Sequence, residues 1–402
     1  MDLFVAPWVI PMAGPPIERG ALAASQGRIR AVGPASLLAR DFPEARRVEL
    51  DGCALLPALV NAHAHLELTL LGSSEARGDF AGWVLDLVRR KRTAAPAIYP
   101  KGIQEGARLC ATRGQGVVGD ILTAPEAAAD YPAAGPQILV FPEVIAPQES
   151  AVRGALERAA SAKPRPGGRA SVAGLSPHAP YTVCAAGYQA CFAEAVRTEG
   201  LLVTHVAESP EELEFCLHGR GALVDRVYAG LNAAPPPPPK THPFEWLDGL
   251  GVIGRRTILV HAVALRPRHV ERIAGLGAGV VLCPRSNRHL GVGRAPGRAF
   301  LDAGVSVALG TDSVLSSGDL DLWKDLVCSV EDYGWRPQEA LRAATIGGAR
   351  VLGLGGEVGA FAPGRRADIL AASLGAGRDL YEGILAESRP VGLWIEGAEF
   401  SL

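Results

Sequence analysis

The sequence lacks paired cysteines. Its cysteines are odd in number and scattered along the chain, and no two of them stand in a CxxC spacing. This distribution excludes a disulfide framework and gives no sign of a thiolate zinc site. The seven positions are Cys53, Cys110, Cys184, Cys191, Cys216, Cys283 and Cys328.

An excess of charge and a long apolar run are also absent. The formal net charge of −2 gives no electrostatic footprint for nucleic acid or for an anionic membrane. No apolar stretch approaches transmembrane length, and the start "MDLFVAPWVIPMAG" lacks the basic region of a signal peptide. Hydrophobic residues make up 48% and charged residues 20%, as in a soluble globular enzyme. We expect a cytoplasmic protein without nucleic-acid or membrane partners.

Apolar strands separated by helical stretches fill residues 55 to 313. Short continuous apolar strands are typical of a parallel sheet that is buried on both faces. Eight of them alternating with helices predict an α/β fold, a (β/α)₈ TIM-like barrel. The expected strands are "ALLPALVNA", "QGVVGDIL", "QILVFPEVI", "ASVAGLSP", "LLVTHVAE", "TILVHAVAL", "AGVVLCPRS" and "VSVALGTDS".

The two ends of the chain share a β character that the middle lacks. "GALAASQGRIRAVG" alternates around a glycine turn, and "GAFAPGRRADILAAS" and "PVGLWIEGAEF" read as β again after the last barrel helices. We therefore expect residues 1–57 and 358–402 to form one small β-sandwich domain beside a barrel of residues 58–357. The run Pro235–Pro239 predicts a stiff loop.

Polar side chains fall at the ends of the predicted barrel strands. His63 and His65 lie one residue apart after an apolar strand, so their side chains share one face. A single histidine is more often an ordinary core or surface residue. The pattern recurs on other strands, however, and the carboxyl ends of barrel strands meet around one mouth, where catalytic groups lie. The other strand-end residues are His178, His205, Glu208, His261, Asn287 and Asp312.

Three neutral imidazoles and one carboxylate suit zinc, with iron or manganese as alternatives. Bound zinc can lower the pKa of a water molecule from 15.7 to about 7. Glu208 is then the natural proton carrier, although "ESPEELEF" also fits a solvated carboxylate at a helix start. We expect His261 to hydrogen-bond the activated water and Asp312 to accept its proton.

The motifs "LVNAHAHLELT", "LSPHAPYTV", "VTHVAES", "ILVHAVAL", "CPRSN" and "LGTDS" occur in the order found in the amidohydrolase superfamily. The chain most resembles its mononuclear-metal branch of aminohydrolases. The resemblance implies that the metal ligands are His63, His65, His205 and Asp312, that Glu208 and His261 transfer protons, and that His178 contacts the substrate. Binuclear members carry a lysine at the end of strand four, where this chain has "GLSPHAP", so the resemblance implies one metal.

Within this branch the signature "NAHAHLEL", with Glu67, looks most like the aminofutalosine deaminases of menaquinone synthesis. The resemblance implies deamination of 6-amino-6-deoxyfutalosine, with Glu67, Trp83 and Asn287 among the substrate contacts. Glu67 could instead support a histidine. Arg89 and Arg90 are candidates for the distal carboxylate of the substrate, or are simply a solvated helix end.

Other readings stay open. The same site could serve a deaminase of S-adenosylhomocysteine, methylthioadenosine or guanine, or a hydrolase of amides or chloro-heterocycles, because one fold hosts many functions. A non-catalytic scaffold has no physical need for Glu208 and His261 together. The expected partner is a small nucleoside, and a homodimer is left open.

Overall fold

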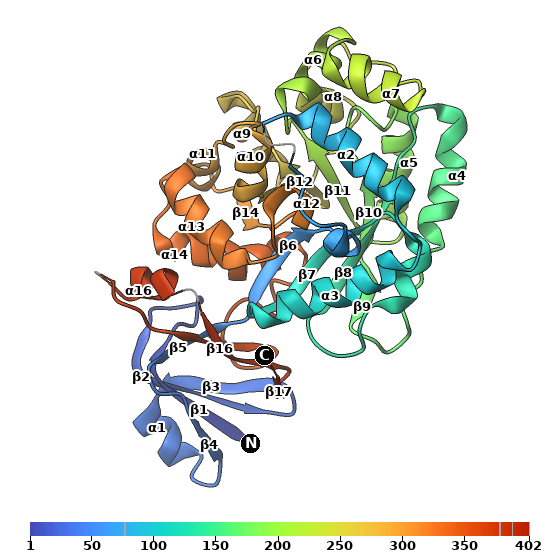
Figure 1. Ribbon diagram of the computed structural model, residues 1–402. Coiled ribbons are helices and arrows are strands. Elements are labelled where there is room, and N and C mark those ends of the chain that lie inside the picture. Colours follow the sequence, from blue (N-terminus) through green and yellow to red (C-terminus); the bar gives the residue numbers. More distant parts are fainter. Residues whose placement is uncertain (76–77, 378, 388, 402) are drawn as a thin grey trace.

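The computed structural model describes residues 1–75, 78–377, 379–387 and 389–401. Its larger sheet runs in the order β14-β13-β12-β11-β10-β8-β7-β6, with all neighbours parallel, and rolls into a nearly closed barrel (Figure 1). Its strands are β6 (Leu59–Ala64), β7 (Gln115–Leu122), β8 (Gln137–Val144), β10 (Gly174–Pro177), β11 (Leu201–Val206), β12 (Thr257–His261), β13 (Gly279–Leu282) and β14 (Ser306–Leu309). The predicted barrel is confirmed.

The barrel is filled by one face of each strand. Val60, Leu139, Phe141, Val203 and Val281 belong to a single buried cluster. The alternate residues pack outward against the helices, as the two-residue period of a strand requires. Both faces of the sheet are therefore largely apolar, and most of the polar side chains of the candidate site lie at the strand ends.

Helices and short helical turns connect the strands and surround the barrel. They are η1 (Leu66–Leu71), α2 (Phe80–Thr93), α3 (Ile98–Thr112), η2 (Pro125–Asp130), α4 (Glu149–Ala160), α5 (Ala185–Arg197), α6 (Pro210–His218), η3 (Leu223–Tyr228), α7 (Ala229–Leu231), α8 (Pro243–Gly249), α9 (Pro267–Leu276), α10 (Pro284–Leu290), α11 (Gly297–Asp302), α12 (Val314–Ser317), α13 (Leu322–Tyr333), α14 (Pro337–Arg342), η4 (Ala343–Gly347) and α15 (Gly348–Val351). Among the described residues, no helix is long and apolar enough to cross a membrane.

The barrel closes at the end where its first and last strands meet. Ala64 forms a parallel bridge with Asp312, and the Asp312 N–H donates to the carbonyl of His63 at 3.0 Å. Below this point Asn61 donates to Thr311 Oγ1 at 2.8 Å and accepts from the Thr311 N–H at 3.1 Å. Buried amides are costly when unpaired, so this network fixes the two strands to each other.

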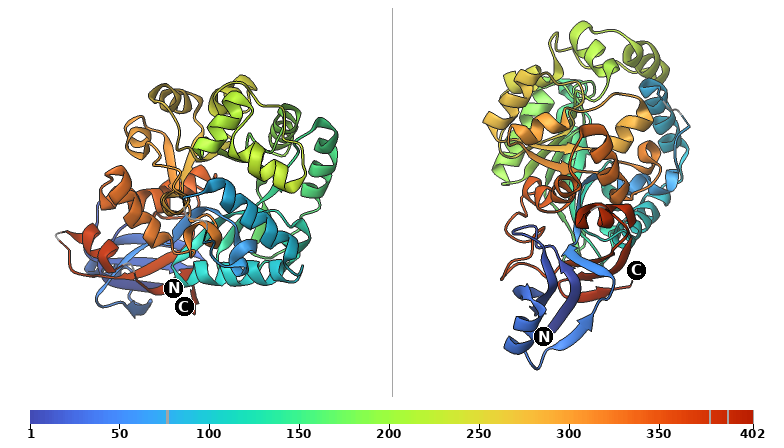
Figure 2. Two further views of the ribbon diagram at one scale, coloured as in Figure 1. Left: turned by 45° about the horizontal axis from the view of Figure 1, so that its top comes forward. Right: turned by 90° about the vertical axis from the view of Figure 1, so that its left-hand side faces the viewer.

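The N- and C-terminal segments pair with each other beside the barrel, as predicted. Their strands join in a single mixed sheet in the order β17-β16-β15-β5-β1-β2-β3, with β4 beside β1. They are β1 (Asp2–Val9), β2 (Ile17–Ser25), β3 (Arg28–Pro34), β4 (Arg46–Glu49), β5 (Cys53–Pro57), β15 (Ile369–Ser373), β16 (Pro390–Ile395) and β17 (Ala398–Phe400), with helices α1 (Ala35–Asp41) and α16 (Leu380–Glu387). Figure 2 shows this sheet at one end of the molecule, with α6 to α8 at the opposite end.

Several of the expected strands have different limits. The run predicted as the first barrel strand divides at Ala58, whose N–H donates to the Asp368 carbonyl, so β5 lies in the small sheet and β6 in the barrel. "ASVAGLSP" divides into β9 (Ala170–Val172) and β10. Of "GAFAPGRRADILAAS" only Ile369–Ser373 is strand. The run Pro235–Pro239 is a loop, and its Pro235 carbonyl accepts from Gln148 Nε2 at 3.0 Å.

Candidate metal centre and active site

Five of the predicted residues converge at the mouth of the barrel. One ligand atom each from His63, His205 and His261 lies within 4.8 Å of the others, and so do those of His63, His65 and Asp312. The two groups share His63 and form one centre. All five side chains are buried. Geometry alone therefore makes His261 a further candidate ligand beside its predicted role in proton transfer.

The backbone at these strand ends is in the left-handed region. His261 has φ 67°, Asp312 has φ 58° and Ala207, between His205 and Glu208, has φ 51°. Such conformations are uncommon for residues with a side chain and persist where the surroundings enforce them. They turn the side chains from the strand direction into the mouth.

Hydrogen bonds fix which nitrogen faces the centre in two of the imidazoles. His205 Nδ1 donates to the carbonyl of His178 at 2.9 Å, and His261 Nδ1 donates to Asn287 Oδ1 at 3.0 Å. In both rings Nε2 is then left with its lone pair. The Nε2 atom of His261 lies 3.5 Å from Glu208 Oε1.

One carboxylate oxygen of Asp312 faces the centre, and the other accepts hydrogen bonds from two serines. Its Oδ2 atom accepts from Ser286 Oγ at 2.7 Å and from Ser316 Oγ at 2.8 Å. Its Oδ1 atom lies 3.4 Å from His65 Nε2 and 3.7 Å from His63 Nε2. The sequence did not single out the two serines, because nothing in it shows that they lie next to Asp312.

Burial sets the charge state of the centre. It lowers the pKa of His65 and of His178 to about 3, so both rings are neutral at physiological pH. Burial alone would raise the pKa of Asp312, but His63 and His65 beside it hold that pKa well below its usual range. Burial, with the charge of Asp312, raises the pKa of Glu208 well above its usual range.

The donor set fits a divalent metal. Both ring nitrogens of His63 and Nδ1 of His65 are buried without a hydrogen-bond partner among the described residues. Buried polar atoms left without partners are costly, and a metal ion would engage the His63 ring. Neutral imidazoles with one carboxylate oxygen form a borderline donor set of the kind that binds zinc.

The remaining predicted residues lie around this centre. The ring of His178 is 5.0 Å from that of His205, and its Nδ1 lies 2.7 Å from Thr182 Oγ1. Trp83 is half-buried on α2 and stacks on Phe80 at 6.0 Å. A line of ring contacts continues from Phe80 through Tyr181 to His178.

Glu67 is fully buried and turned away from the histidines. Its carboxylate accepts from the N–H groups of Thr123 at 3.1 Å and Ala124 at 2.8 Å, and from the Thr123 hydroxyl. Lys91 Nζ on α2 lies 3.8 Å from Glu67 Oε1. This geometry favours a role in fixing the loop after β7 over direct contact with the substrate.

The two arginines considered for the distal carboxylate are engaged elsewhere. Both Arg89 and Arg90 form ion pairs with Asp86, and Arg90 also donates to the Leu71 carbonyl. The geometry therefore favours the alternative, in which both arginines belong to the end of α2 and do not bind the substrate.

Gly310 is a further residue that the sequence did not single out. A Cβ atom there would lie 2.8 Å from both the Cβ atom and the carbonyl oxygen of His63. We expect Gly310→Ala to displace His63, to reduce the metal content of the purified protein and to cost about 1–3 kcal/mol of stability, as overpacking does. Metal analysis and thermal unfolding measure both effects. Gly154→Ala is the control, because open space surrounds Gly154, and full metal loading of Gly310→Ala would contradict the steric argument.

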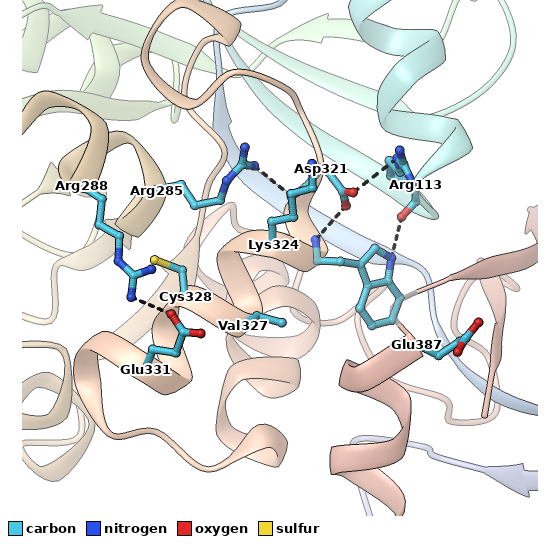
Figure 3. Close-up of a pocket in the computed structure, with 10 residues that line it drawn as sticks. Arg113, Arg285, Arg288, Asp321, Lys324, Val327, Cys328, Glu331 and Glu387 are labelled. Carbon is cyan, nitrogen blue, oxygen red and sulfur yellow. Dashed lines mark hydrogen bonds and ion pairs between the residues drawn. The ribbon is translucent and has the colours of Figure 1, made fainter. Parts of the chain in front are cut away.

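A separate cavity of about 540 Å³ lies between α10, α13 and α16 (Figure 3). Its cations are already paired: Arg288 with Glu331 at 2.8 Å, and Arg113 with Asp321 at 3.5 Å. Trp323 Nε1 donates to the Arg113 carbonyl at 3.1 Å. None of the predicted site residues lines this cavity, and we assign no ligand to it.

A parallel barrel with a histidine and carboxylate centre at the carboxyl ends of its strands defines the class of metal-dependent barrel hydrolases. The chain belongs to the amidohydrolase family, whose sequence profile matches residues 54–398. Members of this family depend on metal ions.

Two curated relatives cover most of the chain. An aminodeoxyfutalosine deaminase of Deinococcus radiodurans is 36% identical over 345 residues, 81% of this chain and 79% of the relative. A 5-methylthioadenosine/S-adenosylhomocysteine deaminase of Syntrophobacter fumaroxidans is 30% identical over 387 residues, 88% of this chain and 80% of the relative. With the family membership, these relatives identify a hydrolytic enzyme of the aminohydrolase type.

Solved structures agree on the fold. An adenosine deaminase of Xanthomonas campestris with bound zinc has a TM-score of 0.80 at 26% identity and covers 99% of this chain and 92% of its own. The aminofutalosine deaminase of Helicobacter pylori in complex with methylthio-coformycin has a TM-score of 0.87 at 21% identity and covers 100% of both chains.

Proposed function

We propose that the protein is a hydrolytic deaminase of adenine nucleosides and that its preferred substrate is 6-amino-6-deoxyfutalosine. The enzyme would convert this substrate and water into futalosine and ammonia. The observation that carries the substrate is the 36% identity with the Deinococcus radiodurans aminodeoxyfutalosine deaminase. The arrangement around the centre supports the reaction type, because ligands, a carboxyl group and an oriented histidine all converge at one mouth.

We assign one divalent metal, zinc in preference to iron or manganese, to His63, His65, His205 and Asp312. β10 ends with Ser176 and Pro177, His178 follows it, and none of them is a lysine that could hold a second ion. The ion, when bound, supplies an activated water molecule for attack on the adenine ring.

The protein residues then orient the reactants and move protons. Glu208 delivers a proton to ring nitrogen N1 as water adds at C6. The amino group takes the proton that Asp312 accepts from the water and leaves as ammonia, while the C6 hydroxyl proton returns to Glu208 as the carbonyl forms. His261 is held by Asn287 through Nδ1, so that its Nε2 atom lies on the side of Glu208 and orients the attacking water. Asp312, steadied by the two serines, accepts the proton of that water.

The substrate needs an apolar wall and a cation beyond the mouth. Trp83 and Phe80 on α2 supply aromatic surface that is continuous with Tyr181 and His178. Lys91 falls on the same face of α2 as Phe80, because eleven residues are close to three helical turns. Its Nζ atom already lies 3.8 Å from Glu67 Oε1. We assign the distal carboxylate to this end of the mouth, where it would share Lys91 with Glu67.

A second candidate function rests on the other relative. At 30% identity, the Syntrophobacter fumaroxidans deaminase favours methylthioadenosine or S-adenosylhomocysteine as the substrate. Both candidates share the adenine nucleoside and differ only in the group at the 5′ carbon of the ribose. The chemistry at the centre is therefore the same for either.

A comparison of nucleosides separates these candidates. We expect aminofutalosine to give the highest kcat/KM, above S-adenosylhomocysteine, methylthioadenosine, adenosine and guanine, since remote binding energy acts through kcat/KM. Ammonia release and the adenine-to-hypoxanthine absorbance change measure turnover, and metal-stripped protein is the control. A preference of about tenfold, or 1.4 kcal/mol, for S-adenosylhomocysteine or guanine would contradict the proposed substrate. The absence of ammonia release from every compound would contradict the proposed deaminase activity.

A further inference from the structure

One glutamate at the mouth of the barrel has no part in the chemistry above. Glu143 is the penultimate residue of β8. Leu139 and Phe141, at two-residue intervals before it, both belong to the cluster that fills the barrel. The alternation of a strand therefore turns the Glu143 side chain inward, in the layer above Phe141.

The carboxylate of Glu143 is not used by the fold. No described residue makes a hydrogen bond or an ion pair with it, although the charges of Lys91 and Arg158 act on it. The residue keeps some exposed surface, yet burial raises its pKa to about 7. A carboxylate that is deep and still accessible faces a cavity, and here that cavity is the barrel mouth.

The neighbouring strand places Glu143 beside the substrate contact expected of His178. Ser176 on β10 is in register with Glu143, and the His178 N–H donates to the Val144 carbonyl at 3.1 Å. Ser176 Oγ is also buried without a partner among the described residues. Glu143 and Ser176 thus place polar atoms without protein partners on the inner wall of the barrel, next to His178.

The position of β8 separates Glu143 from the reacting atoms. In the order of the barrel, β8 stands three strands from β12, which carries His261, and three strands in the other direction from β14, which precedes Asp312. A purine whose C6 edge faces these two residues and whose other edge faces His178 extends its sugar toward Glu143.

We propose that Glu143 binds the substrate by accepting hydrogen bonds from the 2′ and 3′ hydroxyls of the ribose. This inference rests on the proposed nucleoside deaminase function. A vicinal diol offers two O–H donors and a carboxylate offers two acceptor oxygens, so the pair matches atom for atom. A distal carboxylate of the substrate would be repelled at this place, and a thioether would leave the glutamate without a partner.

The test is a two-by-two comparison of protein and sugar. Wild-type and Glu143→Gln holoenzymes are assayed for deamination of adenosine and of 2′,3′-dideoxyadenosine. Hydrogen bonds to a charged group contribute enough for the wild type to prefer adenosine by about 10- to 100-fold in kcat/KM. Glu143→Gln is expected to lose most of this preference by slowing adenosine only, which is the coupling that a double-mutant cycle isolates. Metal content should stay at the wild-type level.

Glu157→Gln is the matched control, because that glutamate lies on α4 with 72% of its side chain exposed. Equal losses for both nucleosides in Glu143→Gln would overturn the diol contact and assign the residue a general structural role. If the variant fails to fold, the wild-type protein alone tests the proposal. Equal kcat/KM values for adenosine and its dideoxy analogue would then overturn the diol contact. No turnover of any purine nucleoside by the wild type overturns the proposed function and this contact with it.

Discussion

Replacing Asp312 by alanine is expected to empty the metal centre and to reduce ammonia release to background. Asp312 contributes the one carboxylate in the cluster, and its Oδ1 atom faces His63 and His65. Without it, the centre loses one of its four assigned ligands, and that ligand is the anionic one, so its affinity for a divalent cation falls. Elemental analysis of the purified protein and an ammonia assay measure the two effects together.

The control for this substitution is Asp302→Ala, which removes an aspartate that is 65% exposed on α11. It should retain wild-type metal and activity. The wild type itself should hold one metal per chain, and two equivalents in the active enzyme would refute the mononuclear assignment. Retention of both metal and turnover in Asp312→Ala would remove this residue from the ligand set.

Glu208→Gln should separate proton transfer from metal binding. Glutamine keeps the size and much of the hydrogen bonding of Glu208 but cannot deliver a proton to N1. We expect the metal to stay bound while kcat falls by on the order of 10²–10⁴, the range for loss of a general acid or base. Single-turnover deamination by metal-loaded protein is the direct measurement.

Glu214→Gln is the comparison for Glu208→Gln, since this glutamate lies on α6, the helix that follows Glu208, with 39% of its side chain exposed. A normal kcat in Glu208→Gln would return Glu208 to the role of a carboxylate at a helix start. Loss of metal from the same variant would instead make it a ligand.

Periodicity predicted most of the barrel because its strands are short apolar runs bounded by polar ends. "QGVVGDIL" coincides with β7 from Gln115 to Leu122. The prediction lost accuracy where an apolar run crosses from one sheet to the other. Nothing in "ALLPALVNA" marks Ala58 as the crossing point, because that point is set by a hydrogen bond to Asp368, distant in sequence.

The histidines of the centre could be predicted because each is a rare polar residue at a strand end. Glu143 could not be predicted, since a lone glutamate within "LVFPEVI" looks like an exposed residue. Only the structure shows that Leu139 and Phe141, on the same face of the strand, lie inside the barrel. Asn61, Ser286 and Ser316 were missed for a related reason. Their value lies in partners that only the closed barrel brings within reach.

The hydrogen bond from the Asp312 N–H to the His63 carbonyl joins the last barrel strand to the first within the cluster itself. Successive side chains of a strand point to opposite faces, so a slip of one residue between these strands would turn Asp312 out of the mouth. The complete donor set therefore forms only in chains whose first and last barrel strands pair in the native register. The amount of metal bound per chain in a preparation thus measures the fraction of chains that have closed the barrel correctly.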